Sequence, residues 1–361
     1  MTSDSSSLAN GISRHILAIA PELNAHDGVE VRVVTLENRG DLHKELDRCG
    51  IVNYAIGNHN GRALSVFFAF FRIMQEFKPD IVHGHSLAIM ERFAMTWFFS
   101  KTKLVTTEHG YGTPAPPQKG LHKVYMSFRH WVLWNVLLHR KSDLVIAVSK
   151  GVREDFGADV VIYNPIKFSP QNLTKTLDMF IIGTACRISE IKNPIAFCNV
   201  LKGVVERLPN AEAWIIGLPD NAELDSIVKL TLKNHPRVRL LGYRPDAPKL
   251  IAQMNCFVMT SQKEGMPTAL LEAIANKVPI AFMEGGGGLR DLSEMNKEEG
   301  PFAIVVPSGD VSNMIKEIIN LLQNKEIAEM YAKKAFEVAK KYFNVDSCVT
   351  KLLFEYKQLL G

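Results

Sequence analysis

Short apolar runs alternate with longer amphipathic stretches through most of the chain. The runs are rich in β-branched residues, which is typical of strands buried on both faces of a parallel sheet. The stretches between them have helical spacing, so the pattern predicts an α/β protein built from repeated βαβ units. Strands are expected at residues 29–36, 81–85, 104–107, 144–148, 179–186, 213–217, 238–242, 256–260 and 278–282, and helices at 12–23, 61–77, 193–207, 221–233, 268–276 and from 310 almost to the end.

A break in this pattern at residues 164–177 divides the chain into two sets of βα units. Asn164-Pro165 and Pro170 interrupt the periodicity within a polar stretch, which is typical of an interdomain linker. We expect an N-terminal domain at residues 1–165, a C-terminal domain at 166–343, and a last helix at 344–361 that could pack back on either domain.

The beginning of the chain does not fit a complete doubly wound domain. Such a domain opens with a central buried strand and a glycine turn into the first helix. The turn at residues 5–11 and the helix are present, but nothing before them can be that strand. The N-terminal sheet is therefore expected to lack its first strand, unless a disordered tail simply precedes an ordinary helix.

Composition narrows the class of protein. At 361 residues, 47% hydrophobic and with ordinary Gly and Pro content, the chain can bury a sizeable core, which excludes collagen-like, disulfide-scaffold and disordered classes. Its five cysteines are widely spaced without a C-x-x-C pair, which favours a reducing cytosol. The start is polar, and no apolar run is long enough to span a bilayer, so a soluble or peripheral protein is expected. A net charge of +4 does not indicate nucleic acid binding.

The segment from Glu264 to Glu272 carries the densest chemical signal. Glu264 follows a predicted strand, and Glu272 lies on the next helix, eight residues and close to two turns after Glu264, so both can face the carboxyl edge of the sheet. Each carboxylate can accept hydrogen bonds from two sugar hydroxyls. Gly265 lets backbone N–H groups approach an anionic ligand at the helix start. Two glutamates around a helix start can equally be a solvated first turn.

Arg187 and Lys192 form a second group, between a predicted strand and the helix beginning at Asn193-Pro194. Two cations beside a helix N-terminus suit a diphosphate, although basic residues in surface loops are common.

With these motifs the chain resembles the retaining GT-B glycosyltransferases of family four, over nearly its whole length. The segment 264–272 resembles the E-x7-E motif of the family, and 187–192 resembles its R-x4-K phosphate pair. The segments 143–149, 161–164 and 242–246 match in order and spacing. The resemblance implies two Rossmann-like domains facing a cleft, with the nucleotide-sugar donor held mainly by the C-terminal domain.

The resemblance also implies roles for single residues. Glu264 would hold the transferred sugar, Glu272 would accept from the ribose hydroxyls, and Arg187 with Lys192 would neutralise the diphosphate. His109 would touch the sugar or acceptor, so Glu264 and His109 are the catalytic candidates. The donor-binding set is Arg187, Lys192, Glu272, Gly265, Met266, Pro267, Thr268, Gly11 and Arg244.

The histidines raise the question of a metal. His109 ends a predicted strand next to Glu108, where it could instead form a structural hydrogen-bonded turn. His83 and His85 end another strand, but no third and fourth ligand lies at suitable spacing, so no metal site is predicted there. The chain also has no D-x-D, the motif by which other transferases hold a donor-bound cation. The resemblance therefore implies metal-independent transfer without a cofactor, through a front-face mechanism.

A basic segment at residues 119–141 bears on the acceptor. It interleaves Trp131 and Trp134 with Lys123, Arg129 and Arg140. Such a helix can lie on an anionic membrane surface, or its tryptophans can belong to a domain core.

The sequence thus predicts a cytoplasmic glycosyltransferase, with contact to the inner membrane as a further hypothesis. It would move a sugar from a nucleotide-diphosphate donor to a glycan or polyprenyl-linked glycan in envelope polysaccharide assembly. A nucleotide-sugar epimerase of the same fold, or a non-catalytic sugar-nucleotide-binding protein, stays open as an alternative. A nicotinamide-dependent oxidoreductase is disfavoured, because no G-x-G-x-x-G follows a strand.

Overall fold

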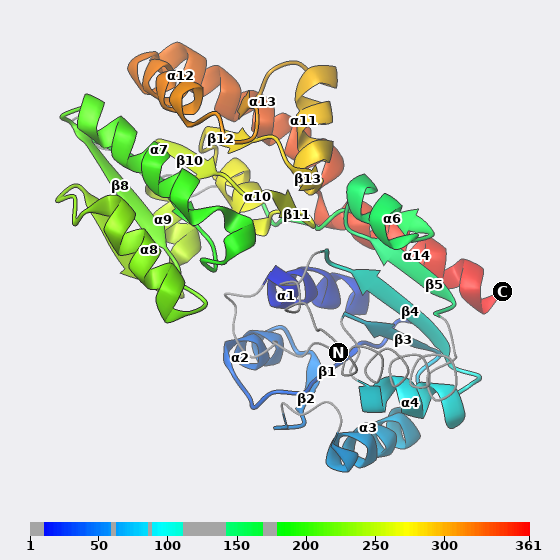
Figure 1. Ribbon diagram of the computed structural model, residues 1–361. Helices are drawn as coiled ribbons and strands as arrows, with labels where there is room; N and C mark the ends of the chain where they lie inside the picture. Colours follow the sequence, from blue (N-terminus) through cyan, green and yellow to red (C-terminus); the bar gives the residue numbers. More distant parts are fainter. Residues whose placement is uncertain (1–10, 59–62, 86–88, 111–141, 169–178) are drawn as a thin grey trace, which may run out of the picture. The chain divides into compact units, whose positions relative to one another are not determined.

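The computed structural model describes residues 11–58, 63–85, 89–110, 142–168 and 179–361. The chain separates into two compact units (Figure 1). The first comprises residues 1–148, 152–162 and 348–361, and the second comprises 149–151 and 163–347. The division at residues 162 and 163 lies close to the boundary expected at 165, and most of the last helix belongs to the first unit.

The second unit is built on one continuous six-stranded parallel sheet. The strand order is β14-β12-β10-β7-β8-β9, which is the doubly wound arrangement. The strands are β7 (Phe180–Ala185), β8 (Ala211–Ile216), β9 (Val238–Gly242), β10 (Cys256–Met259), β12 (Ile280–Met283) and β14 (Ile304–Val306). The helices are η2 (Glu190–Lys192), α7 (Pro194–Arg207), α8 (Ala222–Leu232), α9 (Ala247–Gln253), α10 (Thr268–Ala275), α11 (Gly288–Glu298), α12 (Val311–Gln323) and α13 (Lys325–Tyr342). A pair of two-residue strands, β11 (Lys263–Glu264) and β13 (Gly286–Gly287), lies apart from this sheet.

Helix α7 anchors the core on one face of this sheet. It begins with Pro194, and the Asn193 side chain accepts a hydrogen bond from the Ala196 N–H, so the helix start is fixed by sequence. Phe197 and Leu201 are fully buried in a cluster that includes residues of β7, β8, β10, β12 and α12. Burying a side chain of this size contributes about 1.5–3 kcal/mol. The packing of α7 therefore stabilises one face of the sheet whose loops carry the candidate donor residues.

The described residues of the first unit form two separate parallel sheets. Its strands are β1 (Arg32–Thr35), β2 (Val52–Ala55), β3 (Ile81–Gly84), β4 (Lys103–Glu108), β5 (Leu144–Ala147) and β6 (Val160–Val161). β1 pairs with β2, whereas β3, β4, β5 and β6 form the other sheet. Its helices are α1 (Gly11–Asn24), α2 (Asp41–Arg48), α3 (Leu64–Phe77), α4 (Ile89–Trp97) and α6 (Lys150–Phe156), with α14 (Val345–Leu360) at the end of the chain.

The gap between these two sheets falls where a doubly wound domain has its central strand. In the complete arrangement the first strand lies between the strands that are here β1 and β3. Among the described residues no strand joins them. Val34 of β1 and Val82 of β3 both pack against the cluster around Phe70 and Met74, so α3 supports both sheets.

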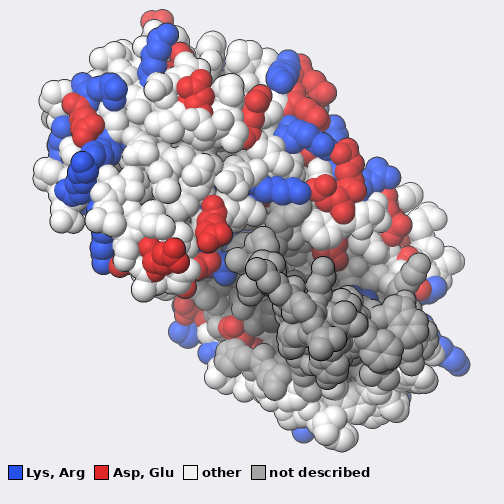
Figure 2. All heavy atoms as spheres, in the orientation of Figure 1, with Lys and Arg blue, Asp and Glu red and all other residues white. Residues whose placement is uncertain are grey.

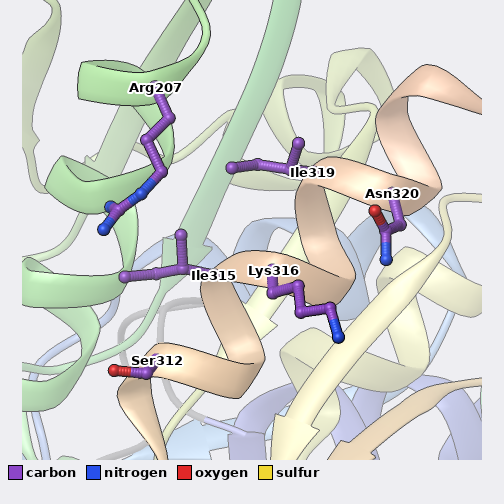
Figure 3. Close-up of a pocket in the computed structure, with 6 residues that line it drawn as sticks. All are labelled: Arg207, Ser312, Ile315, Lys316, Ile319 and Asn320. Atoms are coloured by element: carbon purple, nitrogen blue, oxygen red, sulfur yellow. The ribbon is translucent and has the colours of Figure 1, made fainter.

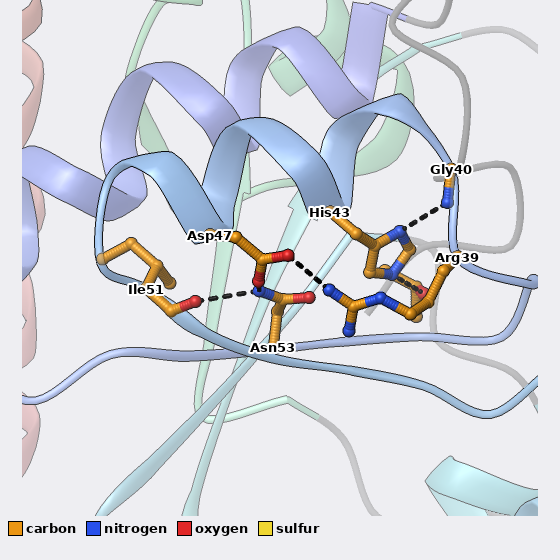
Figure 4. Close-up of polar contacts among 7 residues, drawn as sticks. Arg39, Gly40, His43, Asp47, Ile51 and Asn53 are labelled. Carbon is orange, nitrogen blue, oxygen red and sulfur yellow. Dashed lines mark hydrogen bonds and ion pairs between the residues drawn. The ribbon is translucent and has the colours of Figure 1, made fainter.

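Polar contacts fix α2 beside the smaller sheet (Figure 4). The Gly40 N–H donates to His43 Nδ1 at 3.0 Å, so the proton of the neutral ring lies on Nε2, which is 2.9 Å from Thr35 Oγ1. Asp47 accepts from Arg39 at 2.5 Å and from Asn53 Nδ2 at 2.7 Å. These bonds compensate for the burial of His43, and they connect α2 with both β1 and β2.

The visible face of the molecule carries charges of both signs. Acidic and basic side chains are interspersed over the coloured part of the face shown in Figure 2. Lys341 and Glu299, for example, form an ion pair at 2.6 Å. The predicted basic segment at 119–141, with Trp131 and Trp134, lies outside the described residues. Within the described part of the chain, no helix has both the length and the apolar character needed to cross a membrane.

Candidate active site

Lys192 and Glu264, two of the candidate site residues, lie at the point where the order of the second sheet reverses. From β7 the chain proceeds to β8 and β9 on one side, whereas β10, β12 and β14 lie on the other. The loops after β7 and β10 therefore leave neighbouring strands at the carboxyl edge of the sheet. Ligands of open α/β sheets bind at such a switch point.

Lys192 and Glu264 come together there, although 72 positions separate them in the chain. Lys192 Nζ lies 2.5 Å from Glu264 Oε1, and the two side chains are only 20% and 11% exposed. Lys192 retains two further N–H donors, and Glu264 retains a second carboxylate oxygen. The pair can therefore offer donors to a phosphate and an acceptor to a sugar hydroxyl at one place.

The loop that carries Lys192 is fastened to the loop that carries Glu264. Thr260 Oγ1 donates to the carbonyl oxygens of Lys192 and Asn193 at 3.1 and 3.2 Å. The Gln262 N–H donates to the Ile191 carbonyl at 2.8 Å. Arg187, by contrast, is 68% exposed, and its Nε lies 3.4 Å from Asp220 Oδ1. Lys192 is thus preorganised, whereas Arg187 is free to reorient toward an anion.

The glycine run 285–288 supports the Glu264 loop from the other side. Gly286 and Gly287 form β13, which pairs with Lys263 and Glu264 of β11. A Cβ at Gly288 would lie 2.5 Å from the Gly265 carbonyl oxygen, so only glycine allows this approach. The run is therefore required for close backbone packing against the motif.

The rest of the E-x7-E segment forms the start of α10. Gly265, Met266 and Pro267 are buried, and Pro267 immediately precedes the helix. The Met266 carbonyl accepts from Asn164 Nδ2 at 3.3 Å. Thr268 begins α10 and Glu272 lies one turn further on the same helix, each half-buried.

Arg244 forms a bidentate ion pair with Asp246, two residues further along the same turn. Its Nε and one terminal nitrogen lie 2.8 and 2.7 Å from the two carboxylate oxygens of Asp246, and both side chains are 41% exposed. The hydrogen bonds between them raise the pKa of Arg244 and lower the pKa of Asp246. The structure therefore places Arg244 in a bidentate pair with Asp246, and its predicted donor role stays a prediction.

Asp291 is a supporting residue that the sequence reasoning missed. It is 1% exposed on α11 and accepts from the Lys150 N–H at 2.7 Å, the Gly151 N–H at 3.2 Å and the Tyr163 hydroxyl at 3.0 Å. Burial, followed by the charge of Asp291, raises the pKa of Tyr163. No sequence signal separates this aspartate from an exposed helical acid, because its partners are mostly backbone N–H groups.

The two remaining predicted residues, Gly11 and His109, belong to the first unit. Gly11 is half-buried at the start of α1, and His109 follows β4. His109 Nε2 lies 2.7 Å from His85 Nδ1. Burial, with smaller contributions from neighbouring histidines, lowers the pKa of both rings well below the usual value, so both are neutral at pH 7.

The fold brings two further histidines close to His85, which spacing along the sequence did not indicate. His83 hydrogen-bonds to Tyr356 and Thr107. His15 and His109, from distant parts of the sequence, surround His85, and the ligand atoms of the three lie within 4.8 Å of one another. Spacing along the chain does not reveal this group, because the three histidines come from different segments of the sequence.

A pocket between α7 and α12 is separate from the donor residues (Figure 3). It encloses about 230 Å³ and is lined by Arg207, Ser312, Ile315, Lys316, Ile319 and Asn320. Pockets that hold small ligands usually enclose roughly 300–1,000 Å³. This pocket is therefore too small for a nucleotide sugar, and the switch-point loops remain the candidate site.

Comparison with known proteins identifies the family. Residues 9–168 match the model of Glycosyltransferase Family 4, and residues 179–324 match that of Glycosyl transferases group 1. Together the two models span most of the chain, on both sides of the expected linker.

Individual proteins similar to this chain are also named as sugar transferases. The chain is 26% identical over 298 residues to the sulfoquinovosyl transferase SQD2 of Arabidopsis thaliana, covering 75% of this chain but only 56% of that protein. It is 24% identical to the UDP-Gal:alpha-D-GlcNAc-diphosphoundecaprenol alpha-1,3-galactosyltransferase of Escherichia coli, covering 78% and 76%.

Solved structures show the same fold. Anabaena HepE in complex with UDP and glucose superposes with a TM-score of 0.73, 20% identity and 98% of both chains covered. WaaG, a glycosyltransferase involved in lipopolysaccharide biosynthesis, gives a TM-score of 0.68, 16% identity and 95% of both chains. The chain belongs to the family four glycosyltransferases, and its two α/β units are those of the GT-B fold.

Proposed function

We propose that this chain is a retaining hexosyltransferase of cell-envelope polysaccharide assembly. It moves a sugar from a nucleoside diphosphate sugar to a hydroxyl of a glycan or polyprenyl-linked glycan. The observation that carries the proposal is the contact of Lys192 with Glu264 at the switch point of the second sheet. The relatives named for lipid-linked, lipopolysaccharide and capsular glycan synthesis support this setting.

The diphosphate is bound by fixed positive charge in this proposal. Lys192 uses its two remaining donors on the phosphate oxygens, and Arg187 turns from Asp220 toward the same group. The N-terminus of α7, next to Lys192, adds its partial positive charge. Because these groups neutralise the leaving diphosphate, the proposal requires no metal ion at the donor.

The transfer itself is a front-face substitution. The bond between the anomeric carbon and the diphosphate oxygen breaks, and the acceptor hydroxyl oxygen bonds to that carbon on the same face. The proton of the acceptor hydroxyl passes to the departing phosphate oxygen, so charge and atoms balance. Glu264 orients the sugar through its second oxygen, while Arg187 and Lys192 stabilise the charge that develops on the diphosphate.

Polyprenyl-linked acceptors are membrane-bound, so we place the reaction at the cytoplasmic face of the membrane. His109 contributes from the first unit as a neutral imidazole, able to hydrogen-bond a sugar or acceptor hydroxyl. Glu272, Gly265, Met266, Pro267, Thr268, Gly11 and Arg244 complete the proposed donor-binding set.

The test compares two glutamates that each pair with a lysine. Glu264 faces Lys192 at the site, and Glu329 faces Lys325 on the exposed surface of α13. With GlcNAc-diphosphoundecaprenol as acceptor and a panel of UDP, GDP and ADP sugars, we expect one donor to give a product with retained anomeric configuration by NMR. Glu264→Gln should lower kcat by at least about 100-fold, and Glu329→Gln should leave it unchanged.

Two results would contradict this proposal. Equal activity of Glu264→Gln would remove that residue from the reaction. Acceptor-independent release or epimerisation of the sugar would identify a different enzyme of the same fold, and donor binding without turnover over a wider acceptor panel would indicate a sugar-nucleotide-binding protein.

A further inference from the structure

Three histidines of the first unit face one another across a small space. His15 lies on α1, His85 follows β3, and His109 follows β4. β3 and β4 are parallel neighbours, so the residues after them leave the same edge of the sheet. His15 and His85 are buried, whereas His109 is half-buried.

The rings form a nearly equilateral triangle. The centroid of His15 lies 5.1 Å from that of His85 and 5.0 Å from that of His109, and the last two are 5.0 Å apart. A tetrahedral zinc ion, with Zn–N bonds of about 2.0–2.1 Å, places the centroids of three imidazole ligands about 5 Å from one another. The distances between the ring centroids therefore already match those of three zinc-bound imidazoles.

A surrounding hydrogen bond network holds this arrangement. His83 stacks on His85 with centroids 4.4 Å apart and an interplanar angle of 26°. Both nitrogens of His83 are engaged, by the Tyr356 hydroxyl at 2.5 Å and by Thr107 Oγ1 at 2.6 Å. His83 is thus a supporting residue rather than a fourth ligand, and metal sites depend on such fixed outer neighbours.

From this geometry we propose that His15, His85 and His109 form a binding site for Zn²⁺, with the fourth position open to water. Three protein ligands with one open position are typical of zinc sites that contact small molecules. Imidazole nitrogen also suits Co²⁺, Ni²⁺ and Cu²⁺, so these ions are expected to compete. The proposal uses no residue of the second unit, but it shares His109 with the proposed function.

Metal binding requires one defined rearrangement. His85 Nδ1 and His109 Nε2 are 2.7 Å apart and share one proton. Two zinc ligands must lie about 3.3 Å apart, so these atoms separate by about 0.6 Å. The shared proton moves to the other nitrogen of the ring that carried it, which keeps both rings neutral.

The test measures metal binding by the full chain after removal of adventitious ions with EDTA. Zinc titration by calorimetry should give one equivalent. Co²⁺ substitution should give the absorbance of a tetrahedral site without a thiolate charge-transfer band, which separates it from binding at Cys49, an exposed cysteine. His15→Ala, His85→Ala and His109→Ala should each weaken Zn²⁺ binding by about 100-fold or more.

The matched control is His26→Ala, because His26 is an exposed histidine of the same unit. It should leave the zinc affinity unchanged. Should a buried variant fail to fold, the half-buried His109→Ala and the wild-type chain decide: in wild-type NMR spectra, zinc should shift three histidine ring signals and leave that of His26 unmoved. A folded chain that binds no zinc, binds it through thiolate, or binds it equally well in His109→Ala would overturn the proposal.

Discussion

The two units share one architecture but differ in how completely it is built. The second has a continuous sheet of six strands, and a large cluster of buried residues around Phe197 and Leu201 packs against it. In the first, sheets of two and four described strands are held together by α3, and smaller clusters lie around Phe70 and Leu42.

The difference is reflected in what each unit can hold in place. In the second, charged groups are brought together by loops bonded to one another at the centre of an unbroken sheet, as with Lys192 and Glu264. In the first, polar groups gather where three separate elements meet, as with His15, His85 and His109. A continuous sheet gives more rigid support, so we expect the second unit to be the more stable.

The largest loss of stability should come from truncating one buried phenylalanine in the core of each unit. Phe197 in α7 and Phe70 in α3 are 1% and 2% exposed. Phenylalanine-to-alanine changes in cores cost about 3–5 kcal/mol, and less where the surroundings can relax. The loss in free energy of unfolding, measured with denaturant, should lie at the upper end of this range for Phe197→Ala and at the lower end for Phe70→Ala. The reverse order would show that the split sheet is not the weaker support.

A second contrast concerns the Gly288 position under the motif. In Gly288→Ala the new Cβ would meet backbone atoms of Gly265 and Met266, so the Glu264 loop must move. We expect a loss of about 1–3 kcal/mol in stability together with weaker donor binding. In Gly203→Ala the Cβ meets only side chains, at 2.4 Å from Ile315 Cδ1, so this control should lose stability without losing donor affinity by calorimetry.

Acid should act selectively on the first unit. Burial, followed by the charge of Arg39, lowers the pKa of His43, and Asp47 and Glu37 oppose this only in part. The unfolded chain therefore takes up a proton near pH 6.5 that the folded unit resists. Stability is fully present above that pH and falls as the pH drops below it. Hydrogen exchange of EDTA-treated protein at pH 7.5 and 5 should show the first unit opening before the second, and His43→Gln should reduce the change at β1 and α2.

The smallest effect is expected at Arg244. Its pair with Asp246 is exposed, and exposed pairs contribute little to stability. Arg244→Ala should therefore leave the melting temperature almost unchanged and weaken donor binding only a few-fold, an effect that added salt removes. A large loss of affinity would place Arg244 directly on the diphosphate.

The sequence predicted the position of site residues that directly follow recognisable strands. Lys192 and Glu264 each follow a recognisable strand, so topology alone brings them to one edge. Arg187 and Arg244 carry the same kind of signal, yet the first is exposed and the second pairs with its own turn, because side-chain direction is set by local contacts.

The residues that the sequence did not indicate depend on packing between distant elements. Asp291 is buried because α11 brings it against the N–H groups of Lys150 and Gly151. The triangle of His15, His85 and His109 forms only when α1 packs against the ends of β3 and β4. No periodicity or spacing encodes such contacts.

The central claim is that Lys192 binds the donor diphosphate at the switch point of the second unit. Calorimetric titration of wild type, Lys192→Ala and the exposed control Lys325→Ala with UDP, GDP and ADP tests it directly. The account predicts that one nucleotide binds the wild type and the control equally. It predicts a loss of about 1.5–3 kcal/mol, roughly 10- to 150-fold in affinity, for Lys192→Ala. Unchanged affinity in a folded Lys192→Ala would contradict the account.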